Sequence, residues 1–126
     1  MEIFDDYRYT ENHEWVKVEG DFAYIGITAF AQRELGEIVH VELPEIGDNI
    51  LAGDPFGSLE AVKTVEDLYS PITGEIDKVN GDLFDNPELI NNSPYEDGWL
   101  VKMRYKDKTE IEKLMTPEEY KKLIES

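Results

Sequence analysis

Lys63 is the residue whose surroundings most favour chemistry. It lies between Val62 and Thr64 in the stretch LEAVKTVEDLYSPITGEI, with acidic residues close on both sides. A free lysine amine has a pKa of about 10.4, so a modifying enzyme must deprotonate it before it attacks an activated acyl group. The product is a stable amide without the positive charge. Most lone lysines are simply solvated surface charges, so the neighbouring residues have to decide between the two roles.

The neighbours of Lys63 predict the tip of a hairpin. Val62 and Val65 favour strands, which leaves Lys63-Thr64 as a two-residue turn. Neither residue is the Gly, Asn or Asp that an ordinary tight turn prefers, so turn stability alone does not explain the pair. A hairpin tip is highly exposed, which suits a side chain that another enzyme must grasp. We therefore predict that Lys63 is modified.

The elements that must position this tip read as short strands. EWVKV and FAYIGI flank EGD and predict a hairpin that turns at Gly20. A short helix is predicted over 28–37, with Thr28 as its N-cap, Gly36 as its stop, and Phe30 and Leu35 facing inward. The later strand candidates are separated by tight turns that contain glycine, as in a sandwich or flattened barrel; they lie at 38–43, 49–51, 56–62, 68–70 and 75–79.

The C-terminus predicts a helix over about 116–125. Thr116 matches an N-cap, Pro117 the first helical position, and Glu119 the closing residue of a capping box. Tyr120, Leu123 and Ile124 would then share one apolar face. Residues 1–126 are about the length of one domain, so we expect a single folding unit.

Composition excludes several classes of function. The chain has 12 Lys and Arg against 29 Asp and Glu, a formal charge of −17 that repels nucleic acid and anionic lipid. Because the chain contains no cysteine, disulfides and thiol nucleophiles are excluded, and any redox chemistry must be imported. The acidic N-terminus has no secretory signal, and no apolar run approaches the roughly 18 residues of a membrane span. We expect a cytoplasmic monomer, or a matrix protein if a presequence was removed.

Five stretches, in one order along nearly the whole chain, resemble the H proteins of the glycine cleavage system. They are HEWV (13–16), GIT with AQ (26–32), LGEIVHVELPEIG (35–47), LEAVKTVEDLYSPITGEI (59–76) and NNSPYEDGWL (91–100). The resemblance implies a mainly β, lipoyl/biotinyl-type hybrid sandwich with extra helices, and lipoate in amide linkage to Lys63. It also implies a carrier rather than a catalyst.

The same resemblance implies a cycle of partners. A pyridoxal-phosphate glycine decarboxylase (P protein) would load an aminomethyl group onto the lipoyl arm. A tetrahydrofolate-dependent aminomethyltransferase (T protein) would take the one-carbon unit and release ammonia. Dihydrolipoyl dehydrogenase (L protein) would reoxidise the dithiol with NAD, and a lipoate-attaching enzyme would install the arm. Lys63 would thus be visited by several active sites in turn.

Acidic residues near Lys63 have two candidate roles. The loaded arm ends in an amine, so we expect it to fold back against a carboxylate, and Glu14 and Asp67 are the candidates. Glu60 and Glu66 are candidates for recognition by a basic groove of the attaching enzyme, because complementary charge raises encounter rates. Solvation and solubility are the alternative roles for all four residues.

Other candidate sites are set aside. His13 and His40 have no evident catalytic partner, so a structural role is expected. DKVNGDLFDNPE lacks the calcium-loop spacing and is interpreted as a loop, and the serines lack a nucleophile motif. Tyr95 and Trp99 are expected to stabilise the fold by packing.

Three alternatives to glycine cleavage remain open from the residues alone. Some H-like proteins resemble relays that pass octanoyl or lipoyl groups to other carrier domains. Biotin carriage is disfavoured because related biotinyl domains place methionines beside the lysine, where this chain has Val62 and Thr64. An unmodified acidic interaction module is the alternative without a carrier role. The mass increment on Lys63 would separate the lipoyl, biotin and unmodified cases.

Overall fold

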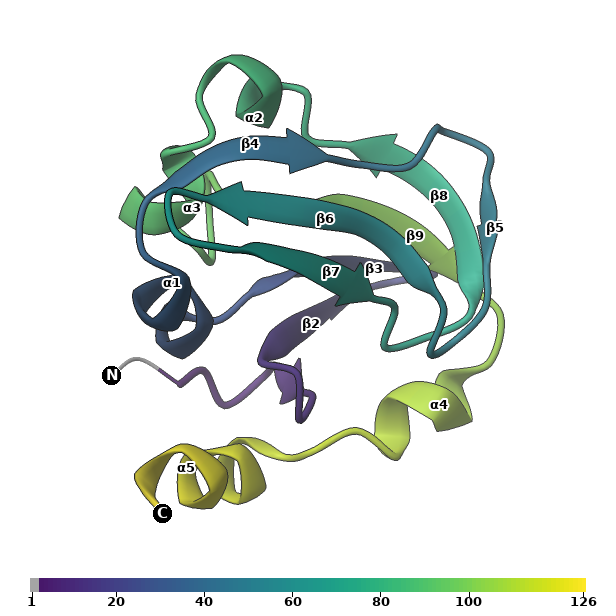
Figure 1. Cartoon of the computed structure of the whole chain (residues 1–126). Helices are drawn as coiled ribbons and strands as arrows, with labels where there is room; N and C mark the ends of the chain where they lie inside the picture. The colour runs from purple at the N-terminus through teal and green to yellow at the C-terminus, as the bar shows by residue number, and fades with distance from the viewer. Residues whose placement is uncertain (1–2) are drawn as a thin grey trace.

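The computed structural model describes residues 3–126 and shows two antiparallel β-sheets, one over the other, with five short helices around them (Figure 1). The six-stranded sheet has the order β1 (Arg8–Tyr9), β2 (Glu14–Glu19), β3 (Phe22–Ile27), β9 (Val101–Tyr105), β8 (Gly74–Val79), β5 (Asn49–Ile50). The three-stranded sheet has the order β4 (Ile38–Glu42), β6 (Pro55–Ala61), β7 (Val65–Tyr69). The predicted mainly β sandwich is therefore confirmed, and its sheets do not close into a barrel.

Alternating side chains from the two sheets form the main core. On β3, Ala23, Ile25 and Ile27 are buried, while the residues between them point to the other face. Leu59 on β6 and Leu68 on β7 belong to the same buried cluster. Period-two alternation thus fixes which face of each strand meets the opposite sheet.

The strand predictions are largely confirmed, with two omissions. The β2–β3 hairpin turns at Gly20, whose φ is 63°. Each strand segment predicted between residues 38 and 79 overlaps an observed strand, β4 to β8. Strands β1 and β9 were not predicted. The interpretation of residues 77–88 as a loop is partly wrong. This segment contains the end of β8 and the short helix α2 (Asp82–Asp85), and α3 (Leu89–Asn92) follows it.

Helix α1 (Ala29–Leu35) has the predicted ends. The Thr28 side chain accepts a hydrogen bond from the Ala31 amide at 3.2 Å, and Gly36 ends the helix with φ 79°. The predicted inward face is confirmed for Leu35, which is half-buried and packs against the core, but the fully buried residue is Ala31, and Phe30 is only half-buried. Phe30 also contacts the ring of His13, which lies in the turn before β2.

Helix α5 (Pro117–Glu125) has the predicted capping box and follows α4 (Lys108–Glu112). Glu119 accepts from the Thr116 amide at 2.9 Å, and Thr116 accepts from the Glu119 amide at 3.2 Å. Of the three residues predicted to share one face, Tyr120 is buried, Ile124 packs with it, and Leu123 is 38% exposed. Helix α5 is therefore held mainly through Tyr120.

A second, aromatic cluster covers the outer face of the six-stranded sheet. Trp15 lies over Gly26 on the neighbouring strand, where an added Cβ would come within 2.5 Å of the indole ring. The rings of Tyr9 and Tyr120 stack at 4.7 Å with an interplanar angle of 7°. Tyr95 is also buried in this cluster, which confirms its predicted packing role. The cluster attaches α5 and the N-terminal segment to the sheet.

Candidate functional site

The hairpin between β6 and β7 presents Lys63 at its tip. The Ala61 amide donates to the Thr64 carbonyl at 2.8 Å, and Glu60 pairs with Val65. The two-residue tip is therefore Val62-Lys63, one residue earlier than predicted. The backbone pairing sets this register, and the sequence alternation could not distinguish it from its neighbour.

The side chains at the tip are exposed. Lys63 and Thr64 are both exposed, and Val62 and Val65 are 67% and 62% exposed. The tip is nevertheless anchored, because the Val62 amide donates to the Glu37 carbonyl at 3.1 Å. A modifying enzyme can therefore reach the Lys63 amine without any part of the sandwich opening.

A cavity of about 340 Å³ lies beside β7, the strand that follows the tip. It is lined mainly by the turn before β2, helix α1 and β7, with single residues from β2, β3 and β6. The cavity brings together Glu14, Glu66 and Asp67, whereas Glu60 is exposed on β6 and is not among the lining residues. Those residues are Glu11, Asn12, His13, Glu14, Ile27, Ala31, Glu34, Leu35, Leu59, Glu66, Asp67, Leu68 and Tyr69.

Glu14 is the buried carboxyl group of this cavity, with only 2% exposure. It faces the three-stranded sheet from β2. Its Oε2 accepts from the Tyr69 amide at 3.2 Å, and its Oε1 accepts from the Thr10 hydroxyl at 3.2 Å. Burial raises the pKa of Glu14 to about 7, although both hydrogen bonds act in the opposite direction. Near neutral pH this group can therefore gain or lose its proton.

His13 connects the cavity to helix α5. Its Nδ1 lies 2.9 Å from the Tyr120 hydroxyl, which lies 2.6 Å from the Thr28 hydroxyl. The His13 backbone has φ 66°, and its ring contacts Phe30 at 4.7 Å between centroids. Burial lowers the pKa of His13. These contacts support the predicted structural role, but no sequence pattern indicated that Tyr120 would be its partner.

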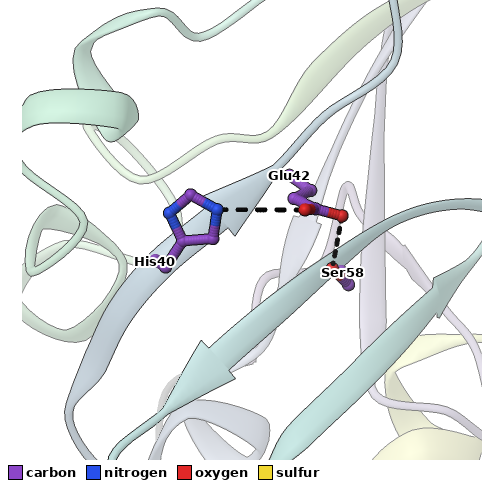
Figure 2. Close-up of polar contacts among 3 residues, drawn as sticks. All are labelled: His40, Glu42 and Ser58. Atoms are coloured by element: carbon purple, nitrogen blue, oxygen red, sulfur yellow. Dashed lines mark hydrogen bonds and ion pairs between the residues drawn. The ribbon is translucent and has the colours of Figure 1, made fainter.

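His40, Glu42 and Ser58 lie together on the exposed face of the three-stranded sheet (Figure 2). Glu42 is in the middle: His40 Nε2 is 4.0 Å from its Oε1, and the Ser58 hydroxyl donates to its Oε2 at 3.4 Å. A nucleophilic triad needs the histidine next to the serine, and here the glutamate separates them. The expected structural role of His40 finds no support here, because its side chain is exposed and its contact with Glu42 is long.

Metal binding and membrane crossing find no support within residues 3–126. The described side chains contain no group of three or more His, Asp or Glu that could hold a metal ion. In the same part of the chain, no helix is long and apolar enough to span a bilayer.

Comparison with known proteins then places the chain. The profile of a family described as "Glycine cleavage H-protein" matches residues 7–126. The chain belongs to the glycine cleavage H-protein family. The H-protein of Bacillus subtilis (strain 168) is 57% identical over 125 residues, which cover 99% of this chain and 98% of that protein. The H-protein of Brevibacillus brevis (strain 47) is 54% identical over 124 residues, covering 98% of each chain.

A solved H-protein structure has the same fold. The crystal structure of the H-protein from Mycobacterium marinum has a TM-score of 0.91 to this chain at 35% identity, covering 98% of this chain and 100% of that one. H-proteins are lipoyl carriers of the glycine cleavage system, and they are carrier components rather than catalysts. The chain is therefore a lipoyl carrier of that system rather than a catalyst.

Proposed function

We propose that Lys63 is the attachment point of the lipoyl group and that the loaded arm folds into the cavity beside β7. The observation that carries this proposal is the combination of an exposed lysine at a hairpin tip with a cavity along the next strand. In an extended strand, Lys63 and Asp67 are about 13 Å apart along the chain. The lysine stem and the lipoyl chain together have a comparable length, so the end of the arm reaches the cavity.

The lining of the cavity suits such an arm. Ile27, Leu35 and Leu59 provide apolar walls for an acyl chain and a dithiolane ring. Glu14 and Asp67 provide carboxyl groups for a cationic end. An approaching ammonium favours the charged form of Glu14, so this residue would release its proton as the loaded arm enters. The loaded arm would then be held by an ion pair within the cavity.

When bound, the lipoyl group supplies the reducible disulfide that a chain without cysteine lacks. Lys63 would hold it for glycine decarboxylase, aminomethyltransferase and dihydrolipoyl dehydrogenase in turn. Tethering keeps the arm at an effective concentration on the order of mM for whichever enzyme has docked. The relatives reported above are bacterial, which supports a cytoplasmic location. That the carrier is a monomer stays a prediction.

Glu60 and Glu66 are proposed to guide the attaching enzyme to the tip. Both are exposed on the strands that lead to and from Lys63, and they face different sides of the hairpin. Opposite charges on the enzyme would raise the encounter rate and orient the amine. Glu66 also lines the cavity, so it is close enough to the arm to act after attachment as well.

The exchange of carbon dioxide into glycine with purified glycine decarboxylase tests the carrier role. The lipoylated chain should support exchange, and a Lys63→Arg variant treated with the same attaching enzyme should not. If the lipoylated chain supports no exchange but donates its lipoyl group to other carrier domains, the chain is a relay, and the proposed shuttle role is wrong although Lys63 carries the arm.

The hydrolysis rate of the loaded arm tests the cavity. Glu14→Ala and Asp67→Ala should each speed the loss of the aminomethyl group, with the larger effect from the buried Glu14. Glu45→Ala serves as a control, because Glu45 is exposed beyond the far end of β4 from the tip. Equal rates in all three variants and the wild type would contradict the proposed arm contacts.

A further inference from the structure

A second cavity, of about 310 Å³, lies on the outer face of the six-stranded sheet. Trp15 lines it, and the preceding residue, Glu14, lines the cavity beside β7. Neighbouring residues of a strand point to opposite faces, so the sheet separates the two cavities. The lining of the second one is mainly aromatic and acidic; it consists of Tyr7, Trp15, Lys17, Glu19, Tyr24, Tyr95, Glu96 and Trp99.

The aromatic walls of this cavity are held in place. The Trp15 indole donates to the Pro94 carbonyl at 3.0 Å, and its ring lies 5.3 Å from that of Tyr7. Tyr24 and Trp99 meet edge to face, with centroids 5.4 Å apart and an interplanar angle of 89°. Both Tyr24 and Trp99 remain half-exposed. Rings fixed at right angles form the kind of corner in which a cation meets more than one ring.

One ammonium group already lies at the edge of the cavity. Lys17 Nζ is 5.9 Å from the centre of the Tyr7 ring and 3.4 Å from Glu19 Oε2. From β9, Lys102 Nζ lies 5.5 Å from the centre of the Tyr24 ring and 3.9 Å from Asp77. Within residues 3–126, no cation–π contact uses the ring of Trp99. Indole is the most favourable ring for such a contact, so the best wall of the cavity is available.

The charge around the cavity is negative. Burial raises the pKa of Tyr7, the ammonium of Lys17 lowers it, and the three carboxylates of Asp6, Glu96 and Glu19 raise it. Within the described chain, Glu19 forms an ion pair and neither Asp6 nor Glu96 does. Two carboxylates therefore remain to attract a further cation.

We propose that this cavity is a docking site for an arginine side chain of a partner protein. A guanidinium is planar, stacks on indole and forms paired hydrogen bonds with a carboxylate, and it is more weakly hydrated than an ammonium. It would stack on Trp99 and pair with Glu96, while Lys17 stays with Glu19. The site is separate from Lys63, so a partner can use it whether or not the arm is loaded.

Tryptophan fluorescence gives a direct test, because both tryptophans of the chain line this cavity. The full-length chain is titrated with the peptide acetyl-Gly-Arg-Gly-amide and, as a neutral control, the same peptide with citrulline. The arginine peptide should change the fluorescence saturably and shift the indole N–H resonance of Trp99, and the citrulline peptide should not. The Lys63→Arg variant should bind equally well, which keeps this test independent of the carrier function.

Two pairs of variants localise the binding. Glu96→Gln should weaken it by about twofold to fivefold, the value of one exposed ion pair, and Glu45→Gln should leave it unchanged. Lys17→Met should strengthen binding by a similar factor, because it removes a competing cation, whereas Lys106→Met removes the same charge elsewhere and should have no such effect. Identical binding of the two peptides, or equal effects within each pair of variants, would overturn the proposal and indicate attraction by net charge alone.

Discussion

The hairpin tip at Lys63 and the cavity beside β7 are neighbours that differ in the burial of their side chains. The tip exposes its side chains and is held by a few backbone hydrogen bonds, whereas the cavity is lined by buried groups such as Leu59 and Glu14. The comparison suggests that the tip is shaped for access by several enzymes. The role proposed for the cavity is to shelter one arm, so substitutions in the two regions should have different effects.

The largest difference in stability is expected between Leu59 and Val62. Leu59 is 0% exposed, so Leu59→Ala should lower the free energy of unfolding by about 2–5 kcal/mol. Val62 is 67% exposed, so Val62→Ala should change it by less than about 0.5 kcal/mol. Urea unfolding measures both values. Similar losses from the two variants would mean that the tip is part of the folded core.

The next largest effect is the pH dependence caused by Glu14. Its pKa is about 7 in the folded protein against 4.5 for the free group, so the folded state binds the extra proton. The contribution of this group to the free energy of unfolding has its full value below pH 4.5 and is lost as the pH rises through 7. Its upper bound is on the order of 3 kcal/mol. Glu14→Gln should remove most of this fall between pH 5 and pH 8 in thermal unfolding.

Asp67→Asn is the matched control for that experiment, because Asp67 lines the same cavity but is exposed. This variant should keep the fall in stability across the same range. If stability falls with pH as steeply in Glu14→Gln as in the wild type, the buried carboxyl of Glu14 does not titrate as described.

A smaller effect is expected for the contact between the cavity and helix α5. Tyr120→Phe removes the hydroxyl that contacts His13 and Thr28, at a cost of about 1 kcal/mol. Tyr105→Phe removes an exposed hydrogen bond to the Gly20 carbonyl and should cost less. Amide hydrogen exchange should also become faster in α5 for Tyr120→Phe only. Faster exchange in both variants would argue against a specific link through His13.

The smallest effect concerns recognition at the tip. Glu60→Lys should slow lipoylation by about twofold to fivefold, the range of one exposed charge pair. Glu45→Lys makes the same charge change beyond the far end of β4 and should have less effect. The initial rate of lipoyl attachment at low ionic strength measures both, and equal rates would assign Glu60 a role in solubility only.

Much of this architecture was predictable because local signals and tertiary structure agree. Gly20 marks the β2–β3 turn, Thr28 and Gly36 mark the ends of α1, and the capping box marks the start of α5. Strand β9 was missed although its signal was present: Val101 and Met103 are buried, and the residues that follow each are not. Its alternation is the pattern expected of a half-buried strand.

Other features had no local signal. The two residues of β1 form a strand because they pair with β2 and, at Tyr9, with Met115. Helices α2 and α3 lack a side-chain cap, so the usual N-terminal signature was missing. At the site, Glu14 and Asp67 line one cavity, and their contact with the loaded arm stays a prediction. The burial of Glu14 against the Tyr69 amide depends on the contact between two sheets, which a single sequence does not specify.

The intact mass and peptide map of the protein from its natural host, grown with lipoate synthesis intact, test the central claim most directly. The account predicts one lipoyl-sized increment, confined to the peptide that contains Lys63. An unmodified Lys63, or the increment on another lysine, would contradict it.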